Sequence, residues 1–329
     1  MRPGKKRVLR SMVGTFGILA GLAGCLGLPV SSVPVVRPEG IPDLWLAPTA
    51  MADALLYVSS STGDNTEGVD VFSYRGRMLR GRLAGFKDPR GLCVDRGGNI
   101  FVPDQLDDEL FEYPHGSAEP IAILHDEPYS GPADCSIDPA SGNLAVANLS
   151  TANYGIAIFK EAKGKPKVYT YGNYGDYFAC GYDDSGNLFV GSLDGNWHFM
   201  LLEMRKGHTD FVKITLRKLP YEFSYTGGVK WDGKYVAVDD QGGSTIYQID
   251  VKGSVGTVVG STRLAYGAES GAFWFPDLKF GENGREATRV LATVAGTDVD
   301  YWNYPTGGIP VKDVPVGNPL GVAVSPAKR

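Results

Sequence analysis

The stretch Gly91-Leu-Cys-Val-Asp95-Arg-Gly-Gly-Asn99-Ile-Phe-Val102 decides the fold, because the same pattern occurs twice more. The second copy is Cys135-Ser-Ile-Asp138-Pro-Ala-Ser-Gly-Asn143-Leu-Ala-Val146, and the third is Cys180-Gly-Tyr-Asp183-Asp-Ser-Gly-Asn187-Leu-Phe-Val190. The asparagines of the three copies stand 44 positions apart. A fixed period of this length indicates a repeat architecture.

Weaker copies of the unit continue toward the carboxyl end. Val229–Val238 is one, and Phe273–Asp277 followed after a longer loop by Arg289–Val294 is another. Gly321–Ser325 matches only the first half of the unit, whereas Leu55–Val58 matches only the second half. The two ends of the chain therefore complete one unit between them.

Each unit predicts a strand, a turn, a second strand, a loop, a third alternating strand and a fourth strand. The Asp-x-x-Gly-Asn turn contains a Gly-Asn pair, which we expect to supply the positive φ of a hairpin turn. Six alternating segments predict the third strands. They are Val69–Tyr74, Glu109–Tyr113, Gly155–Phe159, Phe199–Glu203, Ser244–Ile249 and Val299–Tyr304.

These features predict an all-β fold, a six-bladed β-propeller of four-stranded antiparallel blades. Six units of about 45 residues need about 270 residues, which the segment Leu55–Ser325 provides. We expect the carboxyl-terminal strand to pair with amino-terminal strands and close the ring, because an open blade would leave a sheet edge unprotected.

The units resemble the repeats of NHL-type and gluconolactonase-like propellers, which have the form P-x-G-L-x-V-D-x-x-G-N-[LI]-[FY]-V. Pro89 and Gly91 open one such unit. The resemblance is strong in three units and covers nearly the whole chain after the amino-terminal segment. It implies the fold more than a function, because propellers support many unrelated activities.

Composition excludes some classes of partner. The chain has 329 residues, a formal net charge of −5, and 43% hydrophobic residues, so it can bury a full core. No Lys/Arg cluster follows the first ten residues, and we therefore expect no nucleic-acid partner. A monomer is the default expectation, since a closed propeller needs no second copy to complete its core.

The amino-terminal segment resembles a bacterial lipoprotein signal peptide. Basic residues at positions 2–10 precede a short apolar stretch, which ends in Leu22-Ala23-Gly24-Cys25. Cleavage before Cys25 and lipidation of its thiol are implied by this resemblance. An ordinary secretory signal with an incidental Cys, or an uncleaved anchor, is the alternative.

Three parts of the chain follow from this pattern: a signal peptide (1–24), a lipidated tether (25–52) rich in proline, and the propeller (53–329). The membrane is thus a partner through the lipid anchor. We expect an exported cell-envelope lipoprotein on the periplasmic or the surface face of the outer membrane. The alternative to a free tether is that part of it, Ile41–Leu46, packs on the surface of the propeller.

The channel mouth, where first strands begin and second strands end, is the predicted ligand site. Asp134, Asn148 and Asp239 are also candidates for a Ca²⁺ site, because carboxylate and amide oxygens suit hard cations. The alternative is that such residues simply cap turns and that the aromatics pack between blades. The candidate ligand-binding residues are Asp104, Asp134, Asn148, Tyr177, Asp194, Asp239, Glu269 and Trp274.

Three cysteines other than Cys25 fall in predicted first strands: Cys93, Cys135 and Cys180. Inner strands of neighbouring blades are commonly too far apart for a disulfide. We therefore expect buried free thiols, although an exported protein would permit a bridge.

No catalytic motif is present in the sequence, including G-x-S-x-G, H-E-x-x-H and the phosphate-binding loop. The favoured hypothesis is a binding module that recognises a protein, peptide or glycan. The alternative is a Ca²⁺-dependent, lactonase-like hydrolase with the cation in the channel. The gluconolactonase-like family uses Glu, Asn and Asp as metal ligands, but no Glu opens the unit formed by Leu55 and Gly321.

Overall fold

The computed structural model describes residues 45–61, 67–126, 131–150, 154–172, 176–220, 223, 226–266, 271–277, 286–294 and 297–327. These residues belong to one compact unit, Val33–Arg329. The predicted signal peptide, Cys25, most of the predicted tether and Glu269 lie outside the described residues. Within them the protein is all-β, apart from two short 3₁₀ turns, η1 (Pro48–Ala52) and η2 (Lys160–Ala162).

Four of the sheets are antiparallel, and in three of them the strands follow one another along the chain, whereas the first also contains the carboxyl-terminal strand. Their strands are β1 (Trp45–Leu46), β2 (Leu55–Ser60), β3 (Gly68–Ser73), β4 (Leu79–Leu83) and β25 (Pro319–Ser325); β5 (Cys93–Val94), β6 (Ile100–Asp104), β7 (Glu109–Tyr113) and β8 (Ala122–His125); β9 (Pro132–Ile137), β10 (Leu144–Asn148), β11 (Gly155–Phe159) and β12 (Lys167–Tyr169); and β21 (Phe273–Trp274), β22 (Arg289–Val294), β23 (Asp298–Asn303) and β24 (Lys312–Pro315).

The fifth sheet has eight strands and differs from the predicted pattern of six separate blades. It joins two antiparallel groups of four strands through a parallel pairing of β16 with β20, in which Thr215 lies opposite Val255. This pairing covers two strand edges that would otherwise be exposed. Its strands are β13 (Tyr177–Tyr182), β14 (Leu188–Leu193), β15 (Phe199–Met204), β16 (Val212–Arg217), β17 (Thr226–Trp231), β18 (Val236–Asp240), β19 (Thr245–Lys252) and β20 (Val255–Arg263).

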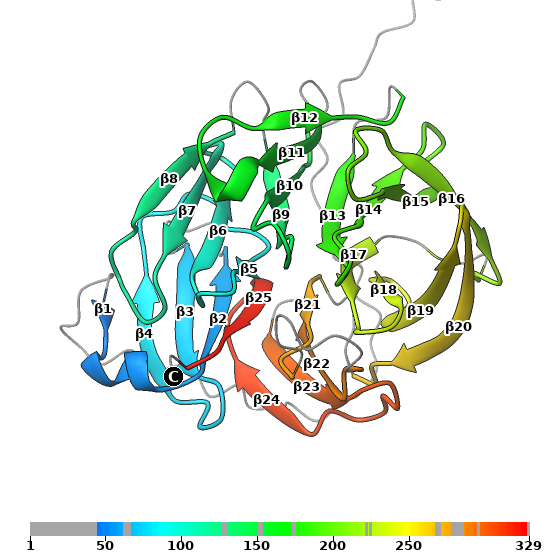
Figure 1. Cartoon of the computed structure of the whole chain (residues 1–329). Helices are drawn as coiled ribbons and strands as arrows, with labels where there is room; N and C mark the ends of the chain where they lie inside the picture. The colour runs from blue at the N-terminus through cyan, green and yellow to red at the C-terminus, as the bar shows by residue number, and fades with distance from the viewer. Residues whose placement is uncertain are drawn as a thin grey trace, which may run out of the picture. The chain divides into compact units, whose positions relative to one another are not determined.

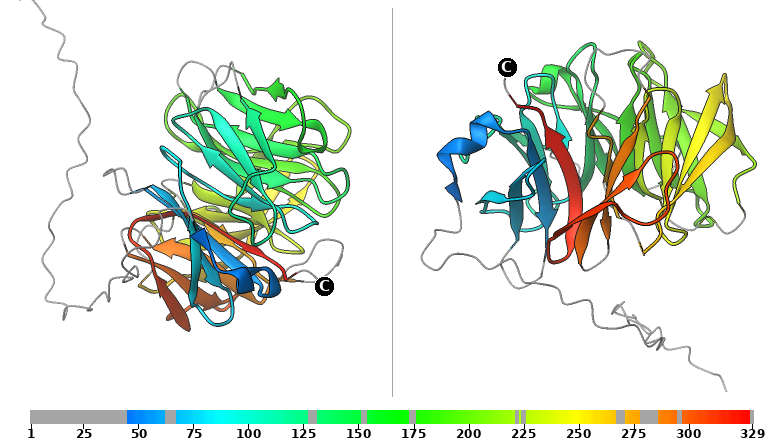
Figure 2. Two further views of the ribbon diagram at one scale, coloured as in Figure 1. Left: turned by 90° about the vertical axis from the view of Figure 1, so that its left-hand side faces the viewer. Right: turned by 90° about the horizontal axis from the view of Figure 1, so that it is seen from below.

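The sheets are arranged around a common centre like the blades of a propeller (Figure 1). The strands nearest the centre are β5, β9, β13, β17, β21 and β25. As predicted, the carboxyl-terminal strand β25 pairs with β2, from Leu55 opposite Ser325 to Ser60 opposite Pro319 (Figure 2). The two ends of the chain therefore share one sheet, which closes the ring.

The repeat aspartate determines where each first strand turns. The Asp95 carboxylate accepts a hydrogen bond from the Asn99 backbone N–H at 2.8 Å, and the Asp183 carboxylate does the same for Asn187 at 2.8 Å. The turn glycines Gly98, Gly142 and Gly186 have φ of 82°, 74° and 87°, so the positive φ is supplied by the glycine alone. All six predicted third strands are present, as β3, β7, β11, β15, β19 and β23.

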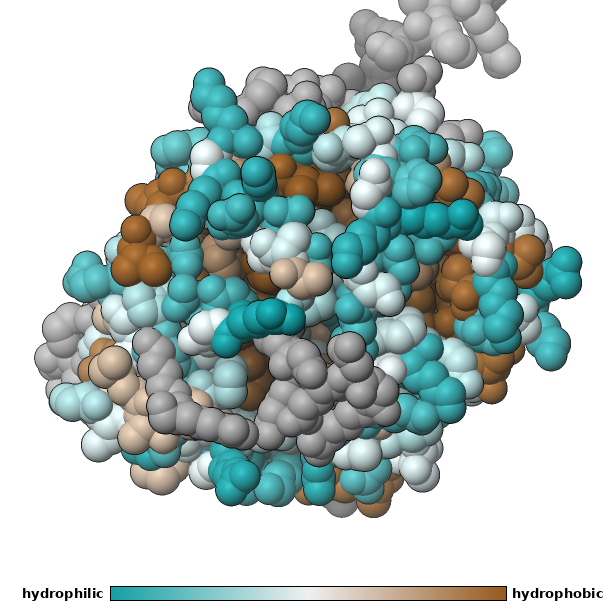
Figure 3. All heavy atoms as spheres, in the orientation of Figure 1, coloured by the Kyte–Doolittle hydropathy of each residue, from teal (hydrophilic) through white to brown (hydrophobic). Residues whose placement is uncertain are grey.

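Polar side chains cover most of the face seen in Figure 3, and apolar side chains show in separate patches.

One outer edge is covered by β1, which pairs with β4 so that Trp45 lies opposite Arg82. The end of the predicted tether thus packs on the sheet, in agreement with the alternative that part of Ile41–Leu46 is not free.

Small residues in the inner strands permit neighbouring strands to approach one another closely. A Cβ on Gly181 of β13 would lie 3.0 Å from Cα of Lys230 in β17, and one on Gly228 would lie 2.9 Å from the Phe273 ring. Gly321 of β25 similarly faces the backbone of Arg90. Close packing between strands therefore explains why glycine stands at these positions.

Gly321→Ala is expected to lower the free energy of unfolding by about 1–3 kcal/mol, because overpacking forces strands apart. The added Cβ would overlap the Arg90 carbonyl and lie 2.7 Å from Oγ of Ser59. Urea denaturation measures the effect. Gly317→Ala is the matched control, since a Cβ there meets nothing within 4 Å; equal losses in the two variants would contradict the argument.

Candidate ligand-binding site in the central cavity

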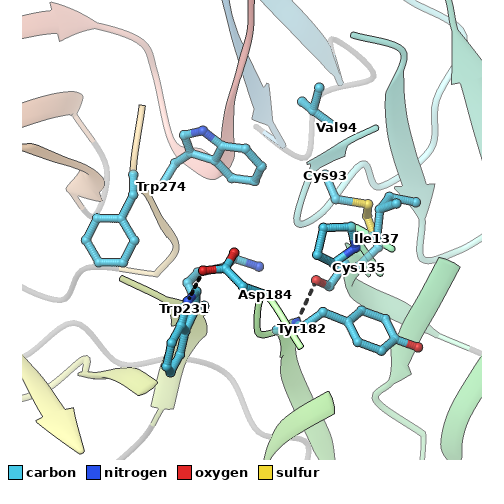
Figure 4. Close-up of a pocket in the computed structure, with 13 residues that line it drawn as sticks. Cys93, Val94, Cys135, Ile137, Tyr182, Asp184, Trp231 and Trp274 are labelled. Carbon is cyan, nitrogen blue, oxygen red and sulfur yellow. Dashed lines mark hydrogen bonds between the residues drawn. A yellow bond between two sulfur atoms is a disulfide. The ribbon is translucent and has the colours of Figure 1, made fainter. Parts of the chain in front are cut away.

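A cavity of about 120 Å³ lies between the inner strands and is open to solvent. Trp231 and Trp274 face Cys93, Val94 and Ile137 across it (Figure 4). The lining residues are Cys93, Val94, Cys135, Ser136, Ile137, Pro139, Gly181, Tyr182, Asp184, Lys230, Trp231, Trp274 and Phe275. Most of these side chains are apolar or aromatic, which is typical of a small-molecule or side-chain pocket.

Two successive positions of the repeat supply most of the lining. The residue immediately before the repeat aspartate lines the cavity in four units, and so does the residue before that. The first set is Val94, Ile137, Tyr182 and Trp231, and the second is Cys93, Ser136, Gly181 and Lys230. Because the units repeat around a centre, equal positions in each unit converge on the same space.

Polar groups fix the aromatic wall of the cavity. The indole N–H of Trp231 donates to the Asp184 carboxylate at 2.9 Å, and the backbone N–H of Tyr182 donates to Oγ of Ser136 at 3.0 Å. Both bonds are drawn in Figure 4. A carboxylate that already holds an indole keeps other lone pairs available for a ligand hydroxyl or N–H group.

A buried ion pair ties three inner strands together beside the cavity. Nζ of Lys230 in β17 lies 3.0 and 3.2 Å from the two carboxylate oxygens of Asp134 in β9, and it donates to the Cys180 carbonyl in β13 at 3.3 Å. The Asp134 carboxylate also accepts the Cys180 backbone N–H at 3.1 Å. Burial raises the pKa of Asp134, and the adjacent ammonium opposes that rise.

Cys93 and Cys135 form a disulfide in the cavity wall, so the prediction of free thiols at these two positions was wrong. The Cα atoms lie 5.6 Å apart, within the usual range for a bridge. The inner strands β5 and β9 are therefore closer together at this point than inner strands of neighbouring blades commonly are. Cys180 is free and buried, and burial raises the pKa of its thiol.

The predicted site residues are only partly brought together. Trp274 lines the cavity. Asp134 is not a lining residue, but it contacts the lining residue Lys230. Asn148 pairs with Pro132 at the start of β9, whereas the lining residue Ile137 is at the end of that strand. The cavity is therefore at the opposite end of the inner strands from the predicted rim.

The other predicted residues have local partners. The buried Asp104 carboxylate accepts the backbone N–H groups of Lys87 and Asp88 at 2.8 and 2.7 Å. The Tyr177 hydroxyl accepts the N–H of Tyr171 at 2.7 Å, and Asp194 caps its own turn by accepting the N–H of Asn196 at 2.8 Å. Asp239 is fully buried in β18.

One of the three residues predicted to bind Ca²⁺, Asp134, already has a cationic partner in the chain. The Asp134 carboxylate already holds the Lys230 ammonium, and a cation would have to displace it. Among the residues that the structure describes, no three His, Cys, Asp or Glu side chains lie close enough together to hold a metal ion. In the hydrolase alternative, Asp134 would therefore have to give up the Lys230 ammonium before it could bind a metal.

Sequence reasoning missed Tyr182, Asp184, Lys230, Trp231 and Phe275. A signal was present, because Tyr182 and Trp231 occupy the same repeat position, directly before the aspartate. The rule that ligands meet propellers where first strands begin drew attention to the end of those strands that lies opposite this cavity.

The fold and this cavity define the class: a β-propeller with an aromatic-lined cavity at its centre. A chain from a crystal structure described as a nidogen/laminin complex is similar in fold, with a TM-score of 0.62 at 10% sequence identity. The match covers 84% of this chain and 99% of that one. The sequence matches no family model and no curated protein.

In the part of the chain that the structure describes, no helix has the length and apolar character needed to span a membrane.

Proposed function

We propose that this protein is a non-catalytic binding propeller, which holds one ring or one side chain of a carbohydrate, peptide or protein ligand in its central cavity. The observation that carries this proposal is that two indoles, Trp231 and Trp274, line one cavity together with the Asp184 carboxylate, to which Trp231 donates a hydrogen bond. Aromatic faces stack on the apolar face of a sugar or on a planar side chain, and the carboxylate orients a polar group.

The size of the cavity supports a ligand of one ring. An apolar cavity of about 150 Å³ accommodates benzene, and this one has about 120 Å³ with an opening to solvent. A larger ligand would insert one ring and leave the rest outside. The solved structure of similar fold is described as a complex of two proteins, which is compatible with a recognition role but assigns no partner here.

The six-bladed, NHL-like architecture belongs to the same proposal. Each half of the eight-stranded sheet, β13–β16 and β17–β20, counts as one blade in this view. Six buried apolar clusters among the described residues support it, since each combines side chains from two successive groups of four strands.

Export and lipidation at Cys25 complete the proposal, with the propeller displayed as a monomer in the periplasm or at the surface of the outer membrane. The amino-terminal sequence is the main support. The bridge between Cys93 and Cys135 adds to it, because disulfides persist mainly in oxidising compartments.

Trp231→Ala and Trp274→Ala are expected to weaken ligand binding about tenfold or more, because each removes an aromatic contact at the centre of the site. The purified full chain is titrated with a panel of mono- and oligosaccharides and short aromatic peptides, followed by tryptophan fluorescence. The ligand that binds is then titrated into each variant by calorimetry.

Trp197→Ala is the matched control. Trp197 is an exposed indole in the turn after β14, at the end of the strands where the predicted rim lies. Binding that survives Trp231→Ala but is lost in Trp197→Ala would place the site at the rim and refute the cavity.

A further inference from the structure

A second polar site lies between the sheets that contain β8 and β10, away from the central cavity. Asp126 follows β8, and Asn148 ends β10 in the neighbouring sheet (Figure 1). Both side chains are fully buried. Neither oxygen of the Asp126 carboxylate and neither polar atom of the Asn148 amide has a hydrogen-bond partner.

The Asp126 side chain is close to both Asn148 and Asp108. The Asn148 amide is near enough to the Asp126 carboxyl to lower its pKa, and the negative charge of Asp108 raises it; burial has the largest effect and brings the pKa to about 7. The amide and the carboxyl nevertheless do not meet in hydrogen-bond geometry. The four unpaired polar atoms thus belong to two neighbouring buried side chains.

Backbone hydrogen bonds fix the positions of the three residues. The Asp126 N–H donates to the Asp108 carbonyl at 3.0 Å, and the Gly131 N–H donates to the Asp108 carboxylate at 2.9 Å. The Leu149 N–H donates to the Gly131 carbonyl at 2.8 Å, which connects the segment to β10. A register shift in β10 between Ala147 and Asn148 sets where the Asn148 side chain lies.

The arrangement lacks a compensating positive charge. Among the described residues, no Lys, Arg or His forms an ion pair with Asp108 or Asp126. A buried carboxylate without a partner is costly, and buried charges are normally paired or bound to metal. Asn148 adds an amide oxygen, and the partly exposed Asp108 leaves a path from solvent.

We infer that Asp126, Asn148 and Asp108 form a Ca²⁺ site between two neighbouring sheets of the propeller. The donors are all oxygen atoms, as hard cations require, and two carboxylates balance the charge of Ca²⁺. Ca²⁺ fits better than Mg²⁺, because Mg²⁺ keeps several waters and an octahedral geometry, whereas this site is enclosed. The bound ion would join the two sheets and is separate from the ligand in the central cavity.

Thermal unfolding of the metal-free full chain tests the site. Ca²⁺ is expected to raise the Tm by about 5 °C at saturating concentration, and Mg²⁺ at equal ionic strength by much less. Asp126→Asn and Asn148→Leu should each remove the Ca²⁺ response. Asp300→Asn is the matched control and should retain it, because Asp300 is another buried carboxylate with an unpaired oxygen, but in β23.

Calorimetric titration of the wild-type chain should show one Ca²⁺ site, and no binding in Asn148→Leu, which carries the test if Asp126→Asn does not fold. Absence of both a Tm shift and binding heat in the wild type would overturn the inference and indicate that the polar atoms bind water. A Ca²⁺ response that persists in Asp126→Asn or Asn148→Leu would overturn it as well, since the ion would then bind elsewhere.

Discussion

Lys230→Met is expected to lower the free energy of unfolding by about 3–5 kcal/mol, because removal of one member of a buried ion pair leaves the other charge uncompensated. Asp134 is 8% exposed, and Lys230 is its cationic partner at 3.0 Å. The same ammonium bonds to the carbonyl of Cys180, so the substitution loosens three inner strands at once. Urea denaturation followed by tryptophan fluorescence measures the loss.

Two further variants separate the ion pair from a general effect of removing a lysine. Lys252→Met should cost less than about 1 kcal/mol, because exposed pairs contribute little; the Lys252 side chain is 82% exposed beside Asp250. The double variant Asp134→Leu/Lys230→Met should recover most of the loss, since an apolar pair avoids the buried charge. Similar losses in Lys230→Met and Lys252→Met would rule out this role for the pair.

Removal of the disulfide by the double substitution Cys93→Ala/Cys135→Ala is expected to lower the free energy of unfolding by about 4 kcal/mol. The bridge joins positions 42 residues apart and connects two neighbouring inner strands, so its loss greatly increases the entropy of the unfolded chain. Dithiothreitol should lower the urea midpoint of the wild type toward that of the double variant.

The double variant itself supplies the control for the reductant, because dithiothreitol should leave its midpoint unchanged. Cys180 is the free buried thiol in the described part of the chain, and it provides no bridge to reduce. A wild-type midpoint that does not respond to reductant would mean that Cys93 and Cys135 are thiols.

Part of the candidate site was predictable from the sequence. Trp274 and Asp134 were both named as candidate ligand-binding residues. Its partner Lys230 lies 96 positions away, and nothing in either local sequence indicates that pairing. The carboxylate was therefore predicted to bind a cation, and the cation is a lysine of the same chain.

The cysteines show a similar limit. Cys93 is two residues before its repeat aspartate and Cys135 is three before its own, and free thiols were predicted because inner strands of neighbouring blades are commonly too far apart for a bridge. In the structure the bridge joins these two non-equivalent repeat positions, whose Cα atoms lie 5.6 Å apart. A sequence alignment compares equal positions of the repeat units, whereas this bridge joins two positions that are not equivalent.

The sequence by itself determined the all-β class, the order of the strands, the turns at the repeat aspartates and the pairing of β25 with β2. These follow from local rules, since alternation, Gly in a turn and a fixed period each act over a few residues. Only the tertiary structure decided the parallel pairing of β16 with β20, the bridge between Cys93 and Cys135, and the convergence of two repeat positions on one cavity. Those features depend on how far each sheet twists and how closely its inner strand approaches the next, and no short stretch of sequence specifies either quantity.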